Sequence, residues 1–160
     1  MNTASRVNLM LAGVGASILA ISNTPTHAAN NLEIIIGNGP HAGTYKLPEA
    51  NTACLSVKAR KQVSAAYKDT KAQDAKTISG AGINVFNPDD AGPKRGEINV
   101  RFGDPDDKRP AAYEILISRD SKDPLTMTKH GTAVELAFNG QTKNGIKLRA
   151  TATCTDIDEF

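Results

Sequence analysis

From residue 32 onward, apolar residues recur at every second position in short runs, which Gly, Pro, Asn and Asp interrupt. The clearest run is EINVRF at 97–102, where Ile98, Val100 and Phe102 alternate with polar residues. A period of two places alternate side chains on opposite faces of a β-strand. The run therefore predicts a strand with one buried and one solvent-facing side.

Seven runs of this kind predict short strands, at 32–36, 44–47, 82–86, 97–102, 112–118, 132–138 and 145–154. Turn residues separate them, and Asn139-Gly140 predicts the turn between the last two runs. The runs do not alternate with helical patterns, which disfavours an α/β fold. The sequence thus predicts a mainly β chain, folded as an antiparallel β-sandwich or barrel of about seven short strands.

Residues 54–77 carry two competing patterns. Leu55, Ala59 and Val63 recur at helical spacing among good helix formers, which predicts one helix near residues 58–70. The same segment contains CLSV and QVSAAY, which also fit two short strands with their charged residues facing outward. The sequence leaves both alternatives open.

The segment 1–28 has the three-part organisation of a secretory signal peptide. Arg6 precedes an apolar stretch, and small residues precede the expected cleavage point after Ala28. The apolar stretch is shorter than the roughly 20 residues that span a bilayer, so no membrane span is expected. We therefore expect an exported protein, either periplasmic or secreted.

Removal of 1–28 from the 160-residue chain leaves 132 residues, which suits a single β domain at 29–155 followed by an acidic tail at 156–160. The chain has 19 basic and 17 acidic residues, and loss of Arg6 leaves a net charge of +1. This near-neutral balance gives no electrostatic reason to expect a nucleic-acid partner or an anionic membrane surface.

Two cysteines, Cys54 and Cys154, remain after the predicted cleavage. An even pair in an exported chain predicts one disulfide, and the phase of the last strand places Cys154 on its buried face. A zinc site built from these cysteines with His41 and His130 is the alternative. It lacks the closely spaced ligand pairs that structural zinc sites use.

Two acidic stretches, NPDDAGPKRG at 87–96 and GDPDDKRP at 103–110, are strong turn sequences. A strand separates them, so they cannot share one ion. The second stretch brings Asp104, Asp106 and Asp107 close together in sequence, which makes calcium the candidate cofactor. Carboxylates of the C-terminal tail would have to complete its coordination shell. Two solvated turns, with no cofactor, are the simpler reading.

Catalytic motifs are weak in this chain. No Ser lies in a Gly-x-Ser-x-Gly elbow, so no catalytic residue is assigned. A small hydrolase would need His41 or His130, two candidate polar loop residues, as its general base. The sequence lacks Trp and offers few aromatic residues for a sugar platform.

These observations favour an exported binding module, acting on a protein partner of unknown identity, over an enzyme. The alternatives are a small secreted hydrolase and a calcium-stabilised structural module.

Overall fold

The computed structural model describes residues 30–92, 94–107 and 111–160. These ranges contain eleven strands: β1 (Asn31–Ile36), β2 (Gly43–Leu47), β3 (Thr52–Val57), β4 (Gln62–Lys68), β5 (Ile78–Phe86), β6 (Arg95–Phe102), β7 (Ala111–Ile117), β8 (Leu125–His130), β9 (Ala133–Gln141), β10 (Lys147–Cys154) and β11 (Asp158–Glu159). Two 3-10 helices, η1 (Glu49–Asn51) and η2 (Lys58–Arg60), join them. The expected signal peptide, 1–28, lies outside the described residues.

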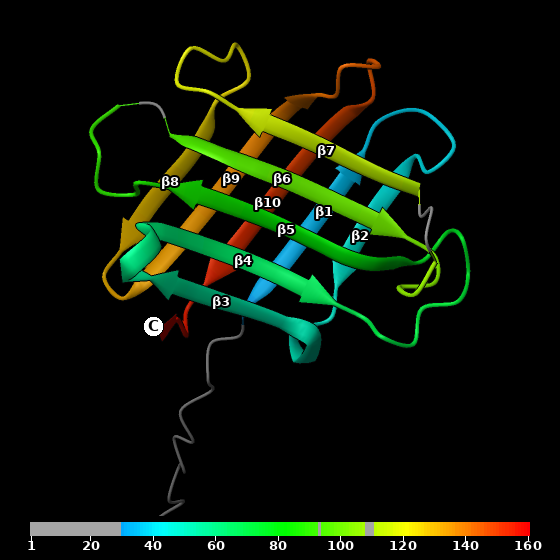
Figure 1. The fold of residues 1–160 in the computed structure, drawn as a ribbon, viewed down its shortest axis with the longest axis horizontal. Helices are drawn as coiled ribbons and strands as arrows, with labels where there is room; N and C mark the ends of the chain where they lie inside the picture. Colours follow the sequence, from blue (N-terminus) through cyan, green and yellow to red (C-terminus); the bar gives the residue numbers. More distant parts are fainter. Residues whose placement is uncertain (1–29, 93, 108–110) are drawn as a thin grey trace, which may run out of the picture.

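The strands form two sheets. Sheet A has the order β2-β1-β10-β9-β8, and sheet B has the order β11-β3-β4-β5-β6-β7. Neighbouring strands are antiparallel, except that β11 runs parallel to β3. Figure 1 shows the two sheets stacked, with the strands of one running across those of the other. Of the two predicted architectures, sandwich and barrel, the fold is therefore the sandwich. It has more strands than the seven expected.

One hydrophobic core lies between the sheets. The alternation predicted at 97–102 is confirmed, because Ile98, Val100 and Phe102 of β6 are all buried. On β10 the alternate residues from Leu148 to Cys154 are buried in the same way. Burial of these apolar stripes, at roughly 25 cal/mol per Å² removed from water, is the main force that joins the sheets.

The segment 58–70 is not the helix that its spacing suggested. After the single turn of η2, Lys61 adopts a left-handed φ of 47° and reverses the chain into β4. Val63, Ala65 and Tyr67 then alternate onto the buried face of sheet B. The two-strand alternative is confirmed, because burial of this alternating face outweighs a weak helix propensity.

Asn139-Gly140 lies inside β9 and does not begin the turn, which falls at Thr142–Gly145 instead. A Cβ at Gly140 would lie 2.5 Å from Cβ of Asp123 and 2.6 Å from the Phe138 ring. Close packing, and not turn formation, therefore explains this glycine.

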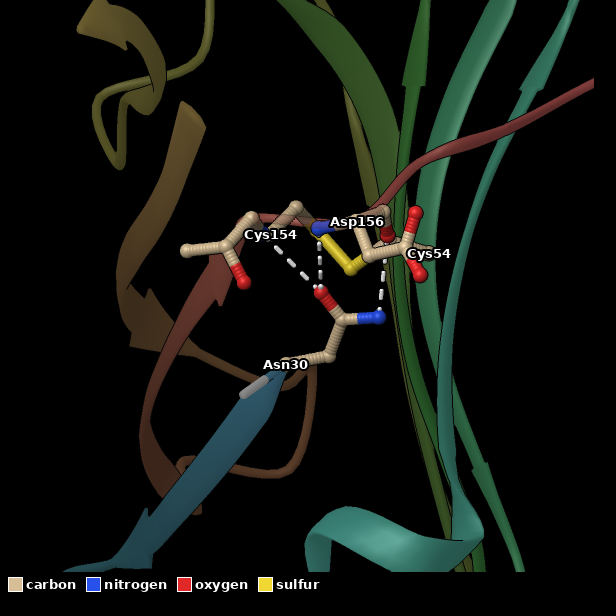
Figure 2. The surroundings of a disulfide bond; sticks show 5 residues. Asn30, Cys54, Cys154 and Asp156 are labelled. Carbon is tan, nitrogen blue, oxygen red and sulfur yellow. Dashed lines mark hydrogen bonds between the residues drawn. A yellow bond between two sulfur atoms is a disulfide. The ribbon is translucent and has the colours of Figure 1, made fainter. Parts of the chain in front are cut away.

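The Cys54–Cys154 disulfide joins β3 of sheet B to β10 of sheet A, as the sequence predicts. Beside it, the Asn30 side chain holds the chain just beyond Cys154 (Figure 2). Its Oδ1 accepts from the backbone nitrogens of Thr155, at 3.0 Å, and Asp156, at 3.2 Å. Its Nδ2 donates to the Asp156 carbonyl at 2.9 Å. The start and the end of the domain are thus fastened at one place.

Within the segment 156–160, expected as an acidic tail, Asp158 and Glu159 form β11 and extend sheet B. Phe160 donates its backbone N–H to the Ser56 carbonyl at 2.9 Å and accepts from the Lys58 N–H at 3.0 Å. Lys58 also forms an ion pair with Glu159 at 2.6 Å. The tail therefore covers the outer edge of β3.

Candidate functional site

The first acidic turn follows β5 and is held by basic side chains from other elements. Asp90 donates its backbone N–H to the Asn87 carbonyl at 3.1 Å, which closes the turn. Asp90 also forms an ion pair with Arg119, and Asp89 lies 3.4 Å from Nζ of Lys129. The turn prediction is confirmed here, and the charges of this turn are already compensated.

The second acidic turn follows β6 and is closed by its own atoms. Asp107 donates its N–H to the Asp104 carbonyl at 3.1 Å, and Asp106 donates its N–H to the Asp104 side chain at 2.8 Å. This is also a turn, in the position that Pro105 favours. Asp104 thus spends one carboxylate oxygen on the turn itself.

The tail carboxylates lie far from this second turn. Asp158 belongs to β11, which is four strands away from β6 in sheet B, or about 19 Å at roughly 4.8 Å per strand. Within the described ranges, no three His, Cys, Asp or Glu side chains form a group that could hold a metal ion. Calcium at Asp104, Asp106 and Asp107 stays a prediction without an identified shell.

His41 lies in the loop between β1 and β2, where both of its ring nitrogens are engaged. Its Nε2 lies 3.2 Å from the Ala75 carbonyl, which can only accept, and its Nδ1 lies 2.7 Å from the Tyr113 hydroxyl. Burial, followed by the nearby Tyr45, raises the pKa of Tyr113, so this hydroxyl keeps its proton. The ring also stacks on Phe102, with the centroids 4.1 Å apart. His41 therefore fastens its loop to β7 and to the chain before β5.

His130 lies at the opposite corner of sheet A. It ends β8, an edge strand, at the end of the sheet where β9 begins, whereas His41 lies beyond the far end of β1. The His130 Nε2 is 3.9 Å from the Glu135 carboxylate, and the side chain is exposed. In the described part of the chain, no hydrogen bond joins either imidazole to a Ser. The hydrolase alternative therefore gains no support from this geometry.

The edges of the two sheets are protected to different degrees. Lysine, proline and covering segments normally protect sheet edges from pairing with another chain. On sheet A, β2 carries Lys46 and is followed by Pro48, while β8 carries Lys129 and forms a further bridge with Lys94. On sheet B, β11 covers β3. The remaining edge strand, β7, has the sequence AAYEILI, without Lys, Arg or Pro.

A groove runs along the free edge of β7, and we call it the edge groove. It has a volume of about 550 Å³. One wall is β7 itself, from Ala112 to Leu116, and the facing wall comes from residues 141–144 and Ile146 of the β9–β10 hairpin. Residues from both faces of β7 line the groove, so it is the backbone edge that faces this space. Figure 1 shows β7 as the outermost strand of its sheet.

A larger hollow, of about 710 Å³, lies on the outer face of sheet B, and we call it the outer-face cleft. Across its floor run Lys68, Gly80, Arg101 and Ala112, paired in that order on β4, β5, β6 and β7. Ala66, Gly82, Asn99 and Glu114 form the next row. Small residues in the middle of the sheet thus create the hollow.

The outer-face cleft holds charges without partners. In the described part of the chain, no ion pair or hydrogen bond involves the side chain of Lys68, Arg101 or Glu114. Asp106 of the second acidic turn also lines the cleft. The acidic turn that the sequence singled out therefore borders this hollow.

Sequence reasoning missed Gly80, Gly82, Lys68 and Arg101 as a group. The alternation of β5 and β6 places them on the outer face, but their alignment depends on strand register. Comparison with protein-family models, with curated proteins and with solved structures finds no match for this chain. Its function must therefore be argued from the structure.

Proposed function

We propose that this protein is an exported binding module that takes up an extended segment of a protein partner as an additional strand beside β7. The observation that carries the proposal is the outer edge of β7, which pairs with no strand of the described residues and faces the edge groove. An edge strand presents a row of N–H and C=O groups, and the chemical complement of that row is another extended backbone. Export is supported by the predicted signal peptide and by the disulfide, which suits an oxidising compartment.

The walls of the edge groove indicate the side chains of the partner. A strand added beside β7 would place alternate residues next to Ile115, which is buried, and Ile146, which packs against the core from a partly buried position. The intervening residues would face solvent beside the exposed Leu116. The partner segment is therefore an alternating apolar and polar sequence.

The facing wall favours a single strand over a second copy of the whole domain. Residues 141–144 border the groove opposite β7, so an approaching sheet would meet the hairpin before it reached the edge. In addition, a two-fold pairing of β7 centred on Glu114 would place two like charges directly opposite each other, which is destabilising.

The test is to select binders from a phage-displayed library of random twelve-residue peptides on the oxidised protein. We expect enriched peptides to alternate apolar and polar residues and to protect β7 amides from hydrogen exchange. Each selected peptide is then made in two N-methylated series, one methylated at its odd-numbered residues and one at its even-numbered residues. In an added strand, only every second N–H points toward β7. One series should therefore lose at least tenfold in affinity, and the other should change little.

Equal losses in both registers, or protection that maps outside β7, would overturn the proposal. Self-association that the peptides displace, measured by sedimentation, would make a second copy the occupant and would also overturn it. Absence of any enriched binder would have the same meaning.

A further inference from the structure

We propose that the outer-face cleft is a separate binding site for a short peptide with a free C-terminus, whose carboxylate lies over Gly80 between Lys68 and Arg101. This site lies on the face of sheet B. It shares Ala112, Tyr113 and Glu114 with the edge groove, but its proposed ligand does not pair with the backbone edge of β7.

Two glycines of β5 lie in the floor of the cleft. Neither Gly80 nor Gly82 has a positive φ. A Cβ would have its nearest neighbour 3.9 Å away at Gly80 and 3.4 Å away at Gly82, which are ordinary contacts. The fold therefore does not require glycine at either position, although glycine within a strand costs about 0.5–1 kcal/mol relative to alanine. The pairing of β5 with β6 shifts register between Ile78 and Gly80, so an irregularity of the strand also accounts for Gly80. Gly82 lies in regular pairing, and a glycine of that kind marks a place where a ligand or another backbone approaches closely.

Two cationic side chains flank the glycine floor of the cleft. Lys68 and Arg101 lie on either side of Gly80 across the sheet, so their Cα atoms are about 9–10 Å apart at two strand spacings. Both side chains line the cleft, and both lack an acidic partner among the described residues. Arginine binds a carboxylate through two parallel hydrogen bonds, which suits this position.

The acidic residues narrow the class of ligand. Glu114 and Asp106 line the same cleft, so its formal charges balance, and a polyanion such as nucleic acid would be repelled as much as attracted. A ligand with one carboxylate and a separate cationic group could pair with the two cations through its carboxylate and with the two acidic residues through its cation. Free peptides have this distribution of charge.

The asparagines complete the match with a peptide. The Asn84 Oδ1 accepts from Gln62 at 3.1 Å, and the Asn99 Nδ2 donates to Glu97 at 3.3 Å. The Asn84 amide NH₂ and the Asn99 carbonyl oxygen are left over, since no further hydrogen bond joins them to the described residues. One donor and one acceptor beside the glycine floor complement the C=O and N–H of a peptide group.

The test uses a pool of dipeptides with free carboxylates and the same pool as C-terminal amides, each titrated while backbone amide resonances are observed by NMR. Dipeptides are too short to form a strand along β7, so the outcome is independent of the proposed function. We expect the acids to shift Gly80, Gly82 and Arg101, and the amides to bind at least tenfold more weakly.

Two variants and one control sharpen the result. Arg101→Gln should abolish the preference for the acids, and Gly82→Val should block the cleft without unfolding the protein. Arg149→Gln, an exposed arginine on the outer face of sheet A, should change nothing.

Equal binding of acids and amides, or no shift at these glycines, would overturn the proposal. Inorganic sulfate provides the remaining arm. If sulfate shifts the same resonances at the same concentration, the site takes an adventitious ion only and the proposal fails.

Discussion

The two edges of sheet B are finished in opposite ways. At the β3 edge, the C-terminal residues add β11, Lys58 and Glu159 form an ion pair, and the Cys54–Cys154 disulfide ties the strand to sheet A. At the other edge, β7 contains no lysine, no strand among the described residues pairs with its outer side, and a groove lies along its backbone.

Under the proposed function, this difference separates stability from binding within one sheet. The β3 side uses a covalent bond and backbone pairing to fix the structure, so changes there should mainly affect stability. On the β7 side, no strand of the described residues pairs with the outer backbone groups, so changes there should mainly affect binding.

Removal of the disulfide on the closed side should have the largest effect. The bond links residues 100 apart in sequence. Closing a loop of that length stabilises a fold by about 4.7 kcal/mol in the chain-entropy description, and loss of a native disulfide costs about 2–5 kcal/mol. We expect the Cys54→Ala/Cys154→Ala protein to lose about 3–5 kcal/mol in urea unfolding.

Reduced wild-type protein is the matched control, because it has the same chain without the bond. It should lose a similar amount of stability. A loss below about 1 kcal/mol in both proteins would show that β11 and the core alone hold the closed side. It would contradict the assignment of a major stabilising role to the disulfide.

Two glycine-to-alanine changes in adjacent strands of sheet B should have opposite signs. At Gly96 of β6, a Cβ would lie 2.1 Å from the Asn84 carbonyl oxygen and 2.3 Å from Leu125, so Gly96→Ala should cost about 1–3 kcal/mol through overpacking. At Gly80 the new methyl group enters the outer-face cleft, and Gly80→Ala should gain about 0.5–1 kcal/mol. Urea unfolding of both variants provides the measurement, and a loss at Gly80 would mean that the fold requires that glycine.

Much of the fold could be predicted from the sequence, because the alternation of apolar and polar residues indicates which side chains of a strand are buried. The run EINVRF became β6 in the expected phase, and the phase of the last run placed Cys154 inside. β8 was missed because its sequence, LTMTKH, alternates only weakly, with Leu125 buried and Met127 half-buried. β11 was missed because its two residues become a strand only by pairing with β3, a contact about 100 residues away in sequence.

The candidate sites depended on information that the sequence does not carry. Whether a strand is an edge depends on the order of the strands, and AAYEILI alone does not distinguish an edge from a central strand. Similarly, Gly80 and Gly96 differ only in what a Cβ would meet, which register and sheet packing decide. Asp106 was selected for calcium from its spacing, whereas the structure places it beside the cleft.

A lysine on the open edge should change association more than stability. Leu116 on β7 is 73% exposed, and Leu116→Lys should alter the free energy of unfolding by no more than about 0.5 kcal/mol. It should nevertheless weaken the binding of an added peptide strand in the edge groove, measured by titration with a selected peptide, because lysine on an edge strand opposes pairing with another chain. Phe160→Lys on the covered side is the matched control, since Phe160 is also 73% exposed. An equal reduction in both variants would show that exposed apolar area matters and the edge itself does not.

The smallest effect is expected at the ion pair that flanks β11. The hydrogen bond and the charge of Lys58 lower the pKa of Glu159 below its usual 4.5. A lowered pKa in the folded state means that the contribution to stability is present above the ordinary Glu pKa and is lost as the pH falls through the folded value. Both side chains are largely exposed, so the pair should contribute little to unfolding in urea.

The measurement is an NMR titration of the Glu159 carboxyl carbon. Its midpoint should lie below 4.5 in the wild type and should return to the usual range in Lys58→Met. The backbone hydrogen bonds of Phe160 with Ser56 and Lys58 do not titrate, so β11 should stay paired with β3 when Glu159 is protonated. Detachment of β11 in acid, seen as loss of amide protection at Phe160, would instead make the ion pair the element that closes this edge. The closed side of sheet B would then be as accessible to a partner strand as the open side.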